Sequence, residues 1–545
     1  MNDSQSIDKD SQIVSLNERI ALLEDRNGLL EEHCKLLEKR NENLAHLVLD
    51  LQETVKKLQD EINRLKGQKS RPKIPPPTLD NGNGKNPGST PRGPSGAITG
   101  PKRIRHQEIV IHPENIPEGS RFKGYSNYHV EELVIEVLKI KYRLAVYQTP
   151  TGEILRGSLP EEFRNKHFGP ELIAYCLDQY YGRAVTRPQL QEQLHGFGIA
   201  ISSGQLDNIL IRDKDGFHKE KEAVFEAGIA NSEYLNTDDT GARHGGKNGY
   251  CTHVGSPLFS FFKSTFSKSR INFLEILRGR HGDYILSEDA LLYAFEQGIS
   301  GQAQEILDDC ANVRFKTKDS WERFLKKKGI GSEKDQRIAT EAALLGSATE
   351  HGLNPNMVIV SDAARQFEVL IHALCWIHEE RHYRKFIPVT EEECVLVAGA
   401  RDMIWDIYES LKEYKTRPTP ELKAHIEESF DGLFGCETSS SAINELFRNS
   451  KSRREGLLKV LDYPYIPLHN NDSERDIREY VKRRKVSGST RSDLGRRARD
   501  TFTSLKKTCV KLGVCFWDYL RDRGGGYGHI MPLPRLVVAR ARGSP

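Results

Sequence analysis

Three acidic residues in this 545-residue chain stand where a fold could bring them together. Asp238 ends a short apolar strand, and a glycine-rich hairpin signal follows at 244–249. Asp362 ends a continuous apolar run of strand length, which is typical of a fully buried central strand. Glu474 follows the natural N-cap residues 471–473 and therefore falls in the first turn of a helix. Two strand ends and one helix start can place three carboxylates side by side.

Three such carboxylates suit phosphodiester chemistry with two magnesium ions. Mg²⁺ prefers hard oxygen ligands and keeps hydrated positions in its coordination shell. In a two-metal site, one ion activates water or a 3′-hydroxyl, and the other stabilises the leaving oxygen during in-line displacement. A structural interpretation also exists, in which residues 238–240 are a polar turn and Ser361 and Asp362 cap the next helix.

Basic residues crowd the segment that follows Glu474. Residues 475–500 contain ten Lys or Arg against four Asp or Glu, with a break at 487–490 between two predicted helices. Basic side chains on helices beside the acids would bind the phosphates of DNA. The candidate DNA-binding residues are Arg475, Arg478, Lys482, Arg483, Arg484, Lys485, Arg496 and Arg497.

The N-terminal residues 1–66 predict a coiled coil. Leucine occupies every d position of an unbroken heptad from 13 to 65, and the a positions hold Ile, Val, Asn and one Cys. This pattern favours a parallel two-stranded coil, in which buried asparagine fixes the register. The rod would be roughly 80 Å long. We therefore predict a homodimer, with higher-order assembly on DNA left open.

Three further regions precede the acids. Residues 67–106 are rich in Pro, Gly, Asn and Ser with scattered basic residues, which indicates a disordered basic linker. Period-two alternation within 107–158 indicates a small antiparallel β domain. Residues 159–230 are helical and contain two short helices around a glycine-bearing turn, a helix-turn-helix pattern. Few basic side chains lie on the second helix, so DNA reading and plain packing remain equal alternatives.

The remaining chain forms one domain and a tail. Residues 231–522 hold the acids, and helical pieces near 280–356 and 390–460 indicate insertions in an α/β core. Residues 523–545 form the tail.

Composition favours a cytoplasmic protein. The nine cysteines are scattered without a CxxC pair, which argues against a disulfide framework and fits reduced thiols. We find no N-terminal signal peptide and no apolar run of 18 residues, so we expect neither secretion by that route nor a membrane span. The expected location is a bacterial-type cytoplasm, in association with the nucleoid.

Three segments carry a more specific pattern: Asn236-Thr-Asp-Asp-Thr240, Cys375-Trp-Ile-His378 with Arg381, and Asn470-Asn-Asp-Ser-Glu-Arg475 followed by Arg483-Arg-Lys485. They resemble the catalytic domain of DDE transposases of insertion-sequence family sixty-six. The resemblance covers roughly residues 160–520, and the leucine-rich coil is similar to that family as well.

The resemblance implies a ribonuclease H-like core that cleaves transposon ends and transfers the 3′-hydroxyl strand into target DNA. It implies two Mg²⁺ ions, for which Mn²⁺ is expected to substitute, with Asp238 as the first acid and Glu474 as the third. The implied partners are double-stranded DNA, as terminal inverted repeats and target, and accessory proteins encoded by the element. Asp239, His378 and Arg381 are expected to line the active site.

The chain departs from this family in two ways. Relatives often carry a cysteine-rich zinc module before the catalytic domain, but residues 107–158 contain no cysteine, so we predict no zinc there. The long spacing from Asp238 to Asp362 also makes Asp289 a rival second acid. Ser287 before Asp289 indicates a capped helix start, whereas the strand before Asp362 is longer, so we favour Asp362.

A second candidate metal site lies between the second and third acids. His372, Cys375, His378 and His382 fall at near-helical spacing and could bind zinc. We favour a structural role, or a place lining the active site, for these four residues.

The leading hypothesis is a dimeric, magnesium-dependent DNA transposase. One alternative is a coiled-coil DNA-binding protein derived from a transposase but without activity. Another is a ribonuclease H-like DNA nuclease that cleaves without strand transfer. Retention of all three acids and of the basic helix after Glu474 argues against loss of activity.

Overall fold

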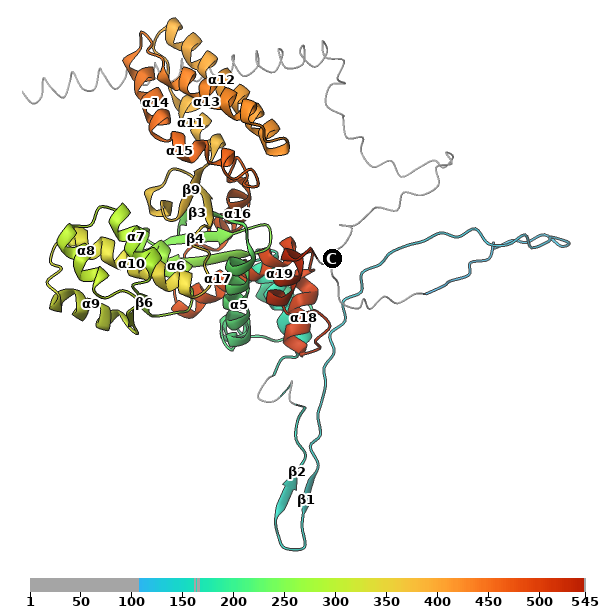
Figure 1. Ribbon diagram of the computed structural model, residues 1–545. Helices are drawn as coiled ribbons and strands as arrows, with labels where there is room; N and C mark the ends of the chain where they lie inside the picture. The colour runs from blue at the N-terminus through green and yellow to red at the C-terminus, as the bar shows by residue number, and fades with distance from the viewer. Residues whose placement is uncertain (1–106, 161–162, 164–166, 544–545) are drawn as a thin grey trace, which may run out of the picture. The chain divides into compact units, whose positions relative to one another are not determined.

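The computed structural model describes residues 107–160, 163 and 167–543 (Figure 1). The predicted coiled coil at 1–66 and linker at 67–106 lie outside the described residues. The described residues belong to one compact unit, Gly93–Pro545. Within this described part, no helix is long and apolar enough to cross a membrane.

A mixed five-stranded sheet forms the centre of the α/β core, in the order β5-β4-β3-β8-β9. β3 (Tyr234–Gly241), β4 (Tyr250–Gly255) and β5 (Ser260–Thr265) are antiparallel neighbours. β8 (Val358–Ser361) runs parallel to β3, and β9 (Ile371–Leu374) runs parallel to β8. Every residue of β8 is buried, as its continuous apolar sequence predicts.

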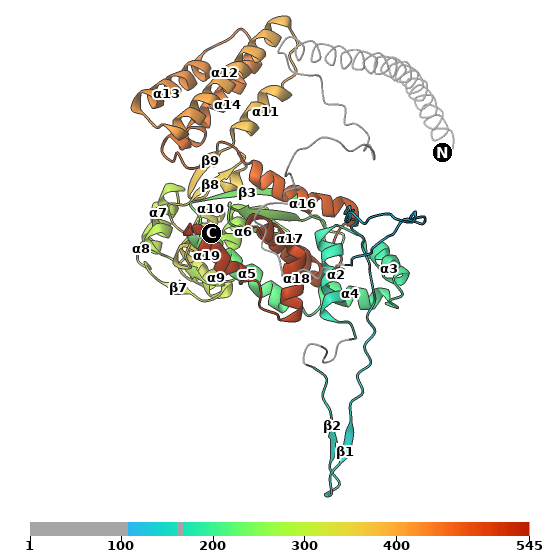
Figure 2. The ribbon, with the colours of Figure 1, turned by 90° about the vertical axis from the view of Figure 1, so that its right-hand side faces the viewer.

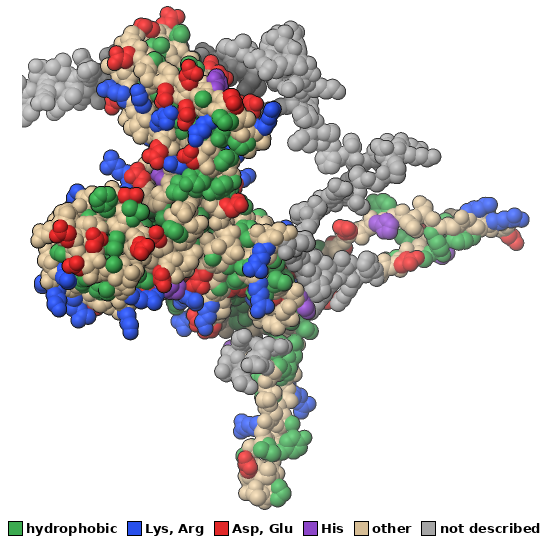
Figure 3. Space-filling model, viewed as in Figure 1, with side chains coloured by type: hydrophobic (Ala, Val, Ile, Leu, Met, Phe, Trp, Pro, Cys, Tyr) green, Lys and Arg blue, Asp and Glu red, His purple; other side chains and the backbone are tan. Residues whose placement is uncertain are grey.

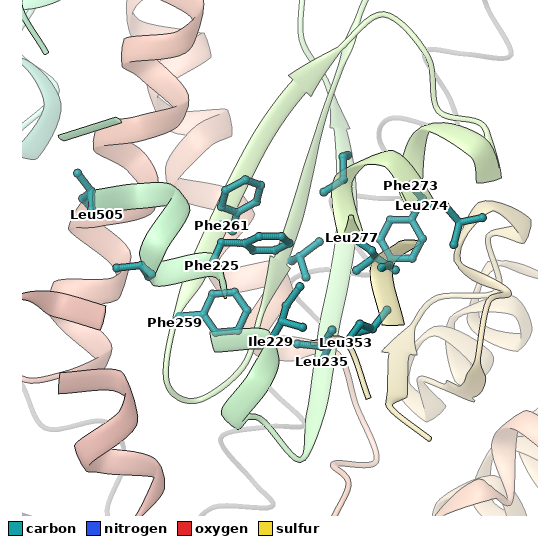
Figure 4. Packing of buried hydrophobic residues seen from close by; sticks show 14 of the residues in the cluster. Phe225, Ile229, Leu235, Phe259, Phe261, Phe273, Leu274, Leu277, Leu353 and Leu505 are labelled. Atoms are coloured by element: carbon teal, nitrogen blue, oxygen red, sulfur yellow. The ribbon is translucent and has the colours of Figure 1, made fainter. Parts of the chain in front are cut away.

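Aromatic side chains fix α5 (Asp215–Asn231) to the sheet (Figure 4). Phe225 of α5 stacks on Phe261 of β5 with their ring centroids 4.0 Å apart. Both residues belong to the largest buried apolar cluster, which also contains Leu235 of β3. Burying one such side chain contributes roughly 1.5–3 kcal/mol, so this layer anchors the helix.

Helix α17 (Asp493–Lys511) covers the free edge of β5. The backbone N–H groups of Ser260, Phe262 and Ser264 donate to the side chains of Thr508, Ser504 and Asp500 at 3.1, 2.9 and 2.7 Å. Four helix residues rise about 6 Å and two strand residues about 6.6 Å, so the two spacings match. The helix therefore satisfies an edge that would otherwise pair with another strand.

Gly228 lets α5 approach the sheet closely. A Cβ atom at this position would lie 2.3 Å from the Phe259 ring, and Phe259 is fully buried. We expect Gly228→Ala to lower the free energy of unfolding by about 1–3 kcal/mol through overpacking. Gly399 of α12 (Glu391–Thr416) is a matched control, because a Cβ there meets nothing within 4 Å. Gly399→Ala should instead stabilise by up to about 1 kcal/mol in urea denaturation, and equal effects of the two changes would contradict this packing.

His218 of α5 makes stability depend on pH. It is buried, and its Nδ1 lies 2.8 Å from Thr501 Oγ1. Burial, together with the charges of Arg497 and Lys221, lowers the pKa of His218 from 6.5 to about 4. Between about pH 6.5 and pH 4 the unfolded chain binds a proton that the folded chain does not, so stability falls on acidification through this range.

Between pH 7 and pH 5, His218 should account for a loss of about 2 kcal/mol in the free energy of unfolding. His218→Asn, which keeps a polar atom near Thr501, should remove that part of the pH dependence in denaturation curves. The same change at the exposed His425 should leave the slope unaltered. An unchanged slope in His218→Asn would refute the assignment.

The first insertion separates β5 from β8 (Figure 1). It packs around α10, which contacts α6, α7 and β6. Trp321 and Tyr284 stack inside it with ring centroids 5.7 Å apart. Its elements are α6 (Arg270–Leu277), β6 (Tyr284–Ile285), α7 (Glu288–Glu296), α8 (Gly301–Asp308), β7 (Arg314–Phe315), α9 (Lys318–Lys327) and α10 (Glu333–Glu350).

A second group of helices follows β9. These helices have their own apolar cluster, to which β8 and β9 contribute Val358, Val360 and Ala373. Figures 1 and 2 both show them beside β9, with which α15 is in contact. The group comprises α11 (Trp376–Lys385), α12, α13 (Pro420–Gly435), α14 (Ser441–Ser452) and α15 (Arg454–Leu457).

The C-terminal helices pack against the sheet and against the helices that precede β3. α16 (Asn471–Ser487) lies on β3 and β4. α18 (Phe516–Gly525) contacts α2 (Pro170–Leu177), and α19 (Leu533–Ala541) contacts α5. The segment predicted as a tail at 523–545 thus contains a packed helix, in which Leu533 and Val537 are fully buried.

Two short helices occupy the predicted helix-turn-helix. They are α3 (Arg187–Gly196) and α4 (Ser203–Ile211), and both carry a capping box. Leu206, Ile209 and Leu210 of α4 are buried in the main core. The exposed face of α4 consists of small and amide side chains, so packing explains its apolar positions.

The region predicted as a small β domain, 107–158, contains one antiparallel pair, β1 (Val146–Gln148) with β2 (Ile154–Arg156). The other alternating stretches, at 108–111 and 134–138, are not strands. Their large apolar side chains are exposed. Alternation alone does not form a sheet when no other element covers the apolar face.

Candidate active site

Asp238 lies within β3, which continues to Gly241 instead of ending at Asp238 as the sequence predicts, whereas Asp362 follows the end of the parallel strand β8. β3 pairs with β8 so that Asn236 lies beside Val360. The same register carried two residues further puts Asp238 level with Asp362, which directly follows β8. On its other side, Asp238 pairs with His253 of β4.

Asn470 ties the start of α16 to the same strand. Its side-chain amide donates to the Thr237 carbonyl at 2.7 Å, and its Oδ1 accepts from the Asn236 amide at 2.9 Å. Its backbone N–H also donates to Cys375 Sγ at 3.2 Å, just before α11. Because Asn470 is buried, these bonds set the first turn of α16, and with it Glu474, against β3.

A buried polar network holds α16 on β4 and β5. His253 Nδ1 lies 2.6 Å from Ser473 Oγ, and its Nε2 lies 3.0 Å from Ser260 Oγ. Ser260 also donates to Asp476, whose carboxylate lies 3.0 Å from Lys511 Nζ. Burial by itself would raise the pKa of Asp476, but hydrogen bonds and the charges of His253 and Lys511 hold it below its ordinary value. The network fixes the rotation of α16 and so the direction of its acidic first turn.

Glu474 faces basic side chains from two helices. Arg381 of α11 lies 3.1 Å from Oε1, and His378 Nε2 lies 3.5 Å from the same atom. Arg478, one turn later in α16, lies 3.3 Å from Oε2. Oε1 is buried, yet no hydrogen bond of good geometry reaches it. Arg381 and His378 therefore orient Glu474 and leave its Oε1 able to accept a further contact.

The three acids influence one another electrostatically. The pKa of Asp238 is raised to about 7, first by burial and further by the negative charges of Asp362, Asp239 and Glu474. The Asp239 backbone N–H, 2.8 Å from Asp238 Oδ1, opposes the shift. Burial is the main cause of this shift, and the neighbouring carboxylates add to it.

Asp239 lies on the other side of β3 from Asp238, because successive side chains of a strand alternate. Gln366 Nε2, from the turn after Asp362, donates to Asp239 Oδ2 at 2.6 Å. Lys268 Nζ lies 3.6 Å from Oδ1. Asp239 thus fastens the turn that carries the second acid, rather than joining the acidic cluster.

The rival acid, Asp289, lies in the first turn of α7 within the first insertion. Ser287 caps that helix and accepts a hydrogen bond from the Ala290 N–H at 3.3 Å. This is the capped helix start that its sequence indicates. Asp362, in contrast, is one of the charges that raise the pKa of Asp238.

The acidic cluster, which consists of Asp238, Asp362 and Glu474, offers the donor atoms that magnesium prefers. All its donors are carboxylate oxygens, and Glu474 Oε1 is buried without a hydrogen bond. Among the described residues, no three His, Cys, Asp or Glu side chains stand close enough to hold a metal ion. Magnesium sites commonly use only one or two carboxylates, with water and substrate phosphates as the other ligands. The carboxylates of Asp238, Asp362 and Glu474 therefore fit magnesium by their chemistry.

Comparison with known proteins identifies the family. The model of the family described as Transposase IS66 family matches residues 356–498, which include Asp362 and Glu474. The uncharacterized protein y4jO of Sinorhizobium fredii (strain NBRC 101917 / NGR234) is 41% identical over 321 residues, which are 58% of this chain and 100% of that relative. The chain belongs to the IS66 family of transposases. Asp238 lies outside the matched span, so its place in the site comes from the strand register.

Most candidate DNA-binding residues of this transposase-family chain lie on the surface of α16 and α17. Figure 3 shows that Lys and Arg also gather over α9, where Lys318, Lys326 and Lys327 are exposed, so basic surface is not confined to α16 and α17. The exposed candidates are Arg475, Arg478, Lys482, Lys485 and Arg497, and the half-buried ones are Arg484 and Arg496.

Arg483 does not belong with these residues. It is buried, and its guanidinium lies 3.7 Å from the centroid of the Tyr180 ring. Burial lowers the pKa of Arg483, although Tyr180 and Tyr181 oppose the shift. The structure places Arg483 in the core and not on the surface where the sequence predicts DNA contact, because a run of basic residues on a helix also turns toward the core.

The four predicted zinc candidates each have a different partner. His372 Nε2 lies 2.7 Å from Ser361 Oγ, and Cys375 Sγ accepts from the backbone of Asn470. His378 faces Glu474. His382 lies 3.2 Å from an Arg453 nitrogen. These contacts support the structural and active-site roles rather than a shared zinc ion.

Sequence reasoning missed several residues that position the site. Gln366 and His253 carried no signal, because each acts through a partner far away in the chain. Asn470 was part of the most specific motif, but its hydrogen bonds to β3 could not be read from the motif.

Proposed function

We propose that this chain is an active DNA transposase that cleaves transposon ends with magnesium and transfers the 3′-hydroxyl strand into target DNA. The observation that carries the proposal is the strand register, which puts Asp238 level with Asp362. Glu474 lies near enough for its charge to raise the pKa of Asp238. The membership in a transposase family agrees with it.

The sheet supports a ribonuclease H-like core. In such a core, three antiparallel strands are followed by two parallel ones, and acids cluster at the central strands. The order β5-β4-β3-β8-β9 has this arrangement, with β3 at its centre. Helical insertions after β5 and after β9 leave the strand order intact.

Each group of residues in the site has a different proposed role in phosphodiester displacement. Magnesium, or manganese in its place, would supply charge that activates the attacking oxygen and stabilises the leaving oxygen. Asp238, Asp362 and Glu474 would hold the ions, and Arg381 keeps Glu474 oriented from α11. Exposed basic residues of α16 would bind DNA phosphates and align the scissile bond.

The proposed partners are the terminal inverted repeats and target DNA, bound as duplexes. A homodimer through the coiled coil at 1–66 would bring two transposon ends together. Accessory proteins encoded by the element are further proposed partners. The protein would act in the cytoplasm, at the nucleoid.

The experiment uses the purified full-length chain, labelled DNA with the element's terminal repeats, a target plasmid and Mg²⁺. We expect end cleavage and joined strand-transfer products, both abolished by EDTA and restored by Mn²⁺. Cleavage without joining would identify a nuclease instead. Binding without cleavage would identify a DNA-binding derivative that has lost activity.

A further inference from the structure

A cavity of about 360 Å³ opens beside Asp362 and continues along α11. Its volume lies within the range of sites that hold small ligands, about 300–1,000 Å³. It is far too small for a DNA duplex. The lining residues are Asp362, Ala363 and Ala364 after β8, Leu374 and Cys375 at the end of β9, and His378, Glu379, His382 and Lys385 of α11.

The α11 wall carries its basic groups in one line. His378, His382 and Lys385 are spaced by four and three residues, so they lie on one helix face. From the first to the last, this face rises about 10 Å. His382 and Lys385 are exposed, and their side chains are accessible to a ligand. The wall thus leads from the acidic cluster to a basic outer end.

The acid in this wall is already neutralised. Glu379 is buried, and its carboxylate lies 2.6 Å from Arg453 and accepts a hydrogen bond from Ser450 at 2.6 Å. Arg453 also lies 3.2 Å from His382 Nδ1. With Nδ1 accepting from Arg453, the Nε2 of His382 carries the proton and can donate to an anionic oxygen.

We propose that this cavity binds one unpaired nucleotide of the DNA strand next to the scissile phosphate, with a flanking phosphate at His382 and Lys385. The proposal rests on the proposed function, because that function puts the scissile phosphate at Asp362. Ala363, Ala364 and Leu374 give the sugar and base an apolar surface. A line of cationic and donor groups at the outer end suits the next phosphate along the strand.

Binding is measured with the full-length chain in EDTA, so that no cleavage occurs. The probes are transposon-end duplexes that are blunt or carry a single-stranded extension of either polarity at the cleavage position. We expect wild type to bind one extended probe about tenfold more tightly than the blunt one. The double variant His382→Ala/Lys385→Gln should reduce that preference by about fivefold or more and leave blunt-duplex affinity unchanged.

Arg384→Gln provides the matched control, because Arg384 is exposed on the same helix but does not line the cavity. It should keep the preference for the extended probe. Equal affinity of wild type for all probes would overturn the proposal, and so would equal effects of the double variant and Arg384→Gln. A double variant that keeps the preference would likewise overturn it.

The outcomes separate this site from the function on which it rests. Strand transfer without any preference for extended probes would reject the nucleotide site and retain the transposase. A preference that depends on His382 and Lys385, in a chain that never cleaves, would retain the nucleotide site and reject the catalytic activity. Competition by inorganic phosphate alone, with no effect of the extension, would identify an anion site and reject the nucleotide.

Discussion

Asp238→Asn, Asp362→Asn and Glu474→Gln should each reduce end cleavage and strand transfer by about 10³-fold or more. Each change keeps the size of the side chain and removes one anionic oxygen that is proposed to bind magnesium. The three acids are expected to work as one unit. The activity of the double variants should therefore be scarcely lower than that of the single variants. Cleavage is measured on labelled transposon-end DNA with Mg²⁺.

The folded stability of these variants distinguishes lost chemistry from misfolding. The raised pKa of Asp238 means that its ionised form is unfavourable in the folded chain. Asp238→Asn should therefore unfold at a temperature no lower than wild type does. Asp289→Asn is the matched control and should retain activity, since Asp289 lies in the capped first turn of α7. Loss of activity in Asp289→Asn but not in Asp362→Asn would reverse the assignment of the second acid.

Asn470→Ala should lower the free energy of unfolding by about 2–4 kcal/mol. The change removes the bond to the Thr237 carbonyl and leaves the buried Asn236 amide without its acceptor. It also frees the first turn of α16, so strand transfer should fall even at temperatures where the variant is folded. Urea denaturation and the cleavage assay measure the two effects on the same preparation.

The adjacent Asn471 provides the control for Asn470. Asn471 is half-buried at the first position of α16, where alanine is well tolerated. Asn471→Ala should cost less than about 0.5 kcal/mol. If the two alanine variants lose equal stability, the hydrogen bonds of Asn470 do not hold α16 against β3.

The strands of the core could be predicted from sequence because each signal is local. The apolar run that ends at Ser361 requires a buried strand, and the glycines at 245 and 246 supply the positive φ of the β3–β4 turn. The edge cover by α17 could not be predicted, since it depends on matching Thr508, Ser504 and Asp500 to a strand more than 230 residues earlier.

The positions of Asp362 after a buried strand and of Glu474 in the first turn of a helix could be predicted from the sequence, because both signals are local. The ion-binding role of these acids stays a prediction. The place of each arginine could not be read from the sequence, because arginine serves both surface and core. Arg483 shows this ambiguity, because its planar guanidinium stacks on Tyr180 as readily as it binds phosphate. The partners of Glu474 were expected to line the site, but only the fold reveals that Arg381 and His378 face the same oxygen.

Convergence of the three acids on bound metal can be measured without any DNA chemistry. Fe²⁺ replaces Mg²⁺ in carboxylate sites, and with ascorbate and peroxide it cleaves the backbone close to where it is bound. In the full-length chain we expect cuts near 238, near 362 and near 474, all suppressed by excess Mg²⁺ and by Asp238→Asn. Cuts near 289 without cuts near 362, or no cut that depends on Asp238, would contradict a metal site built from these three carboxylates.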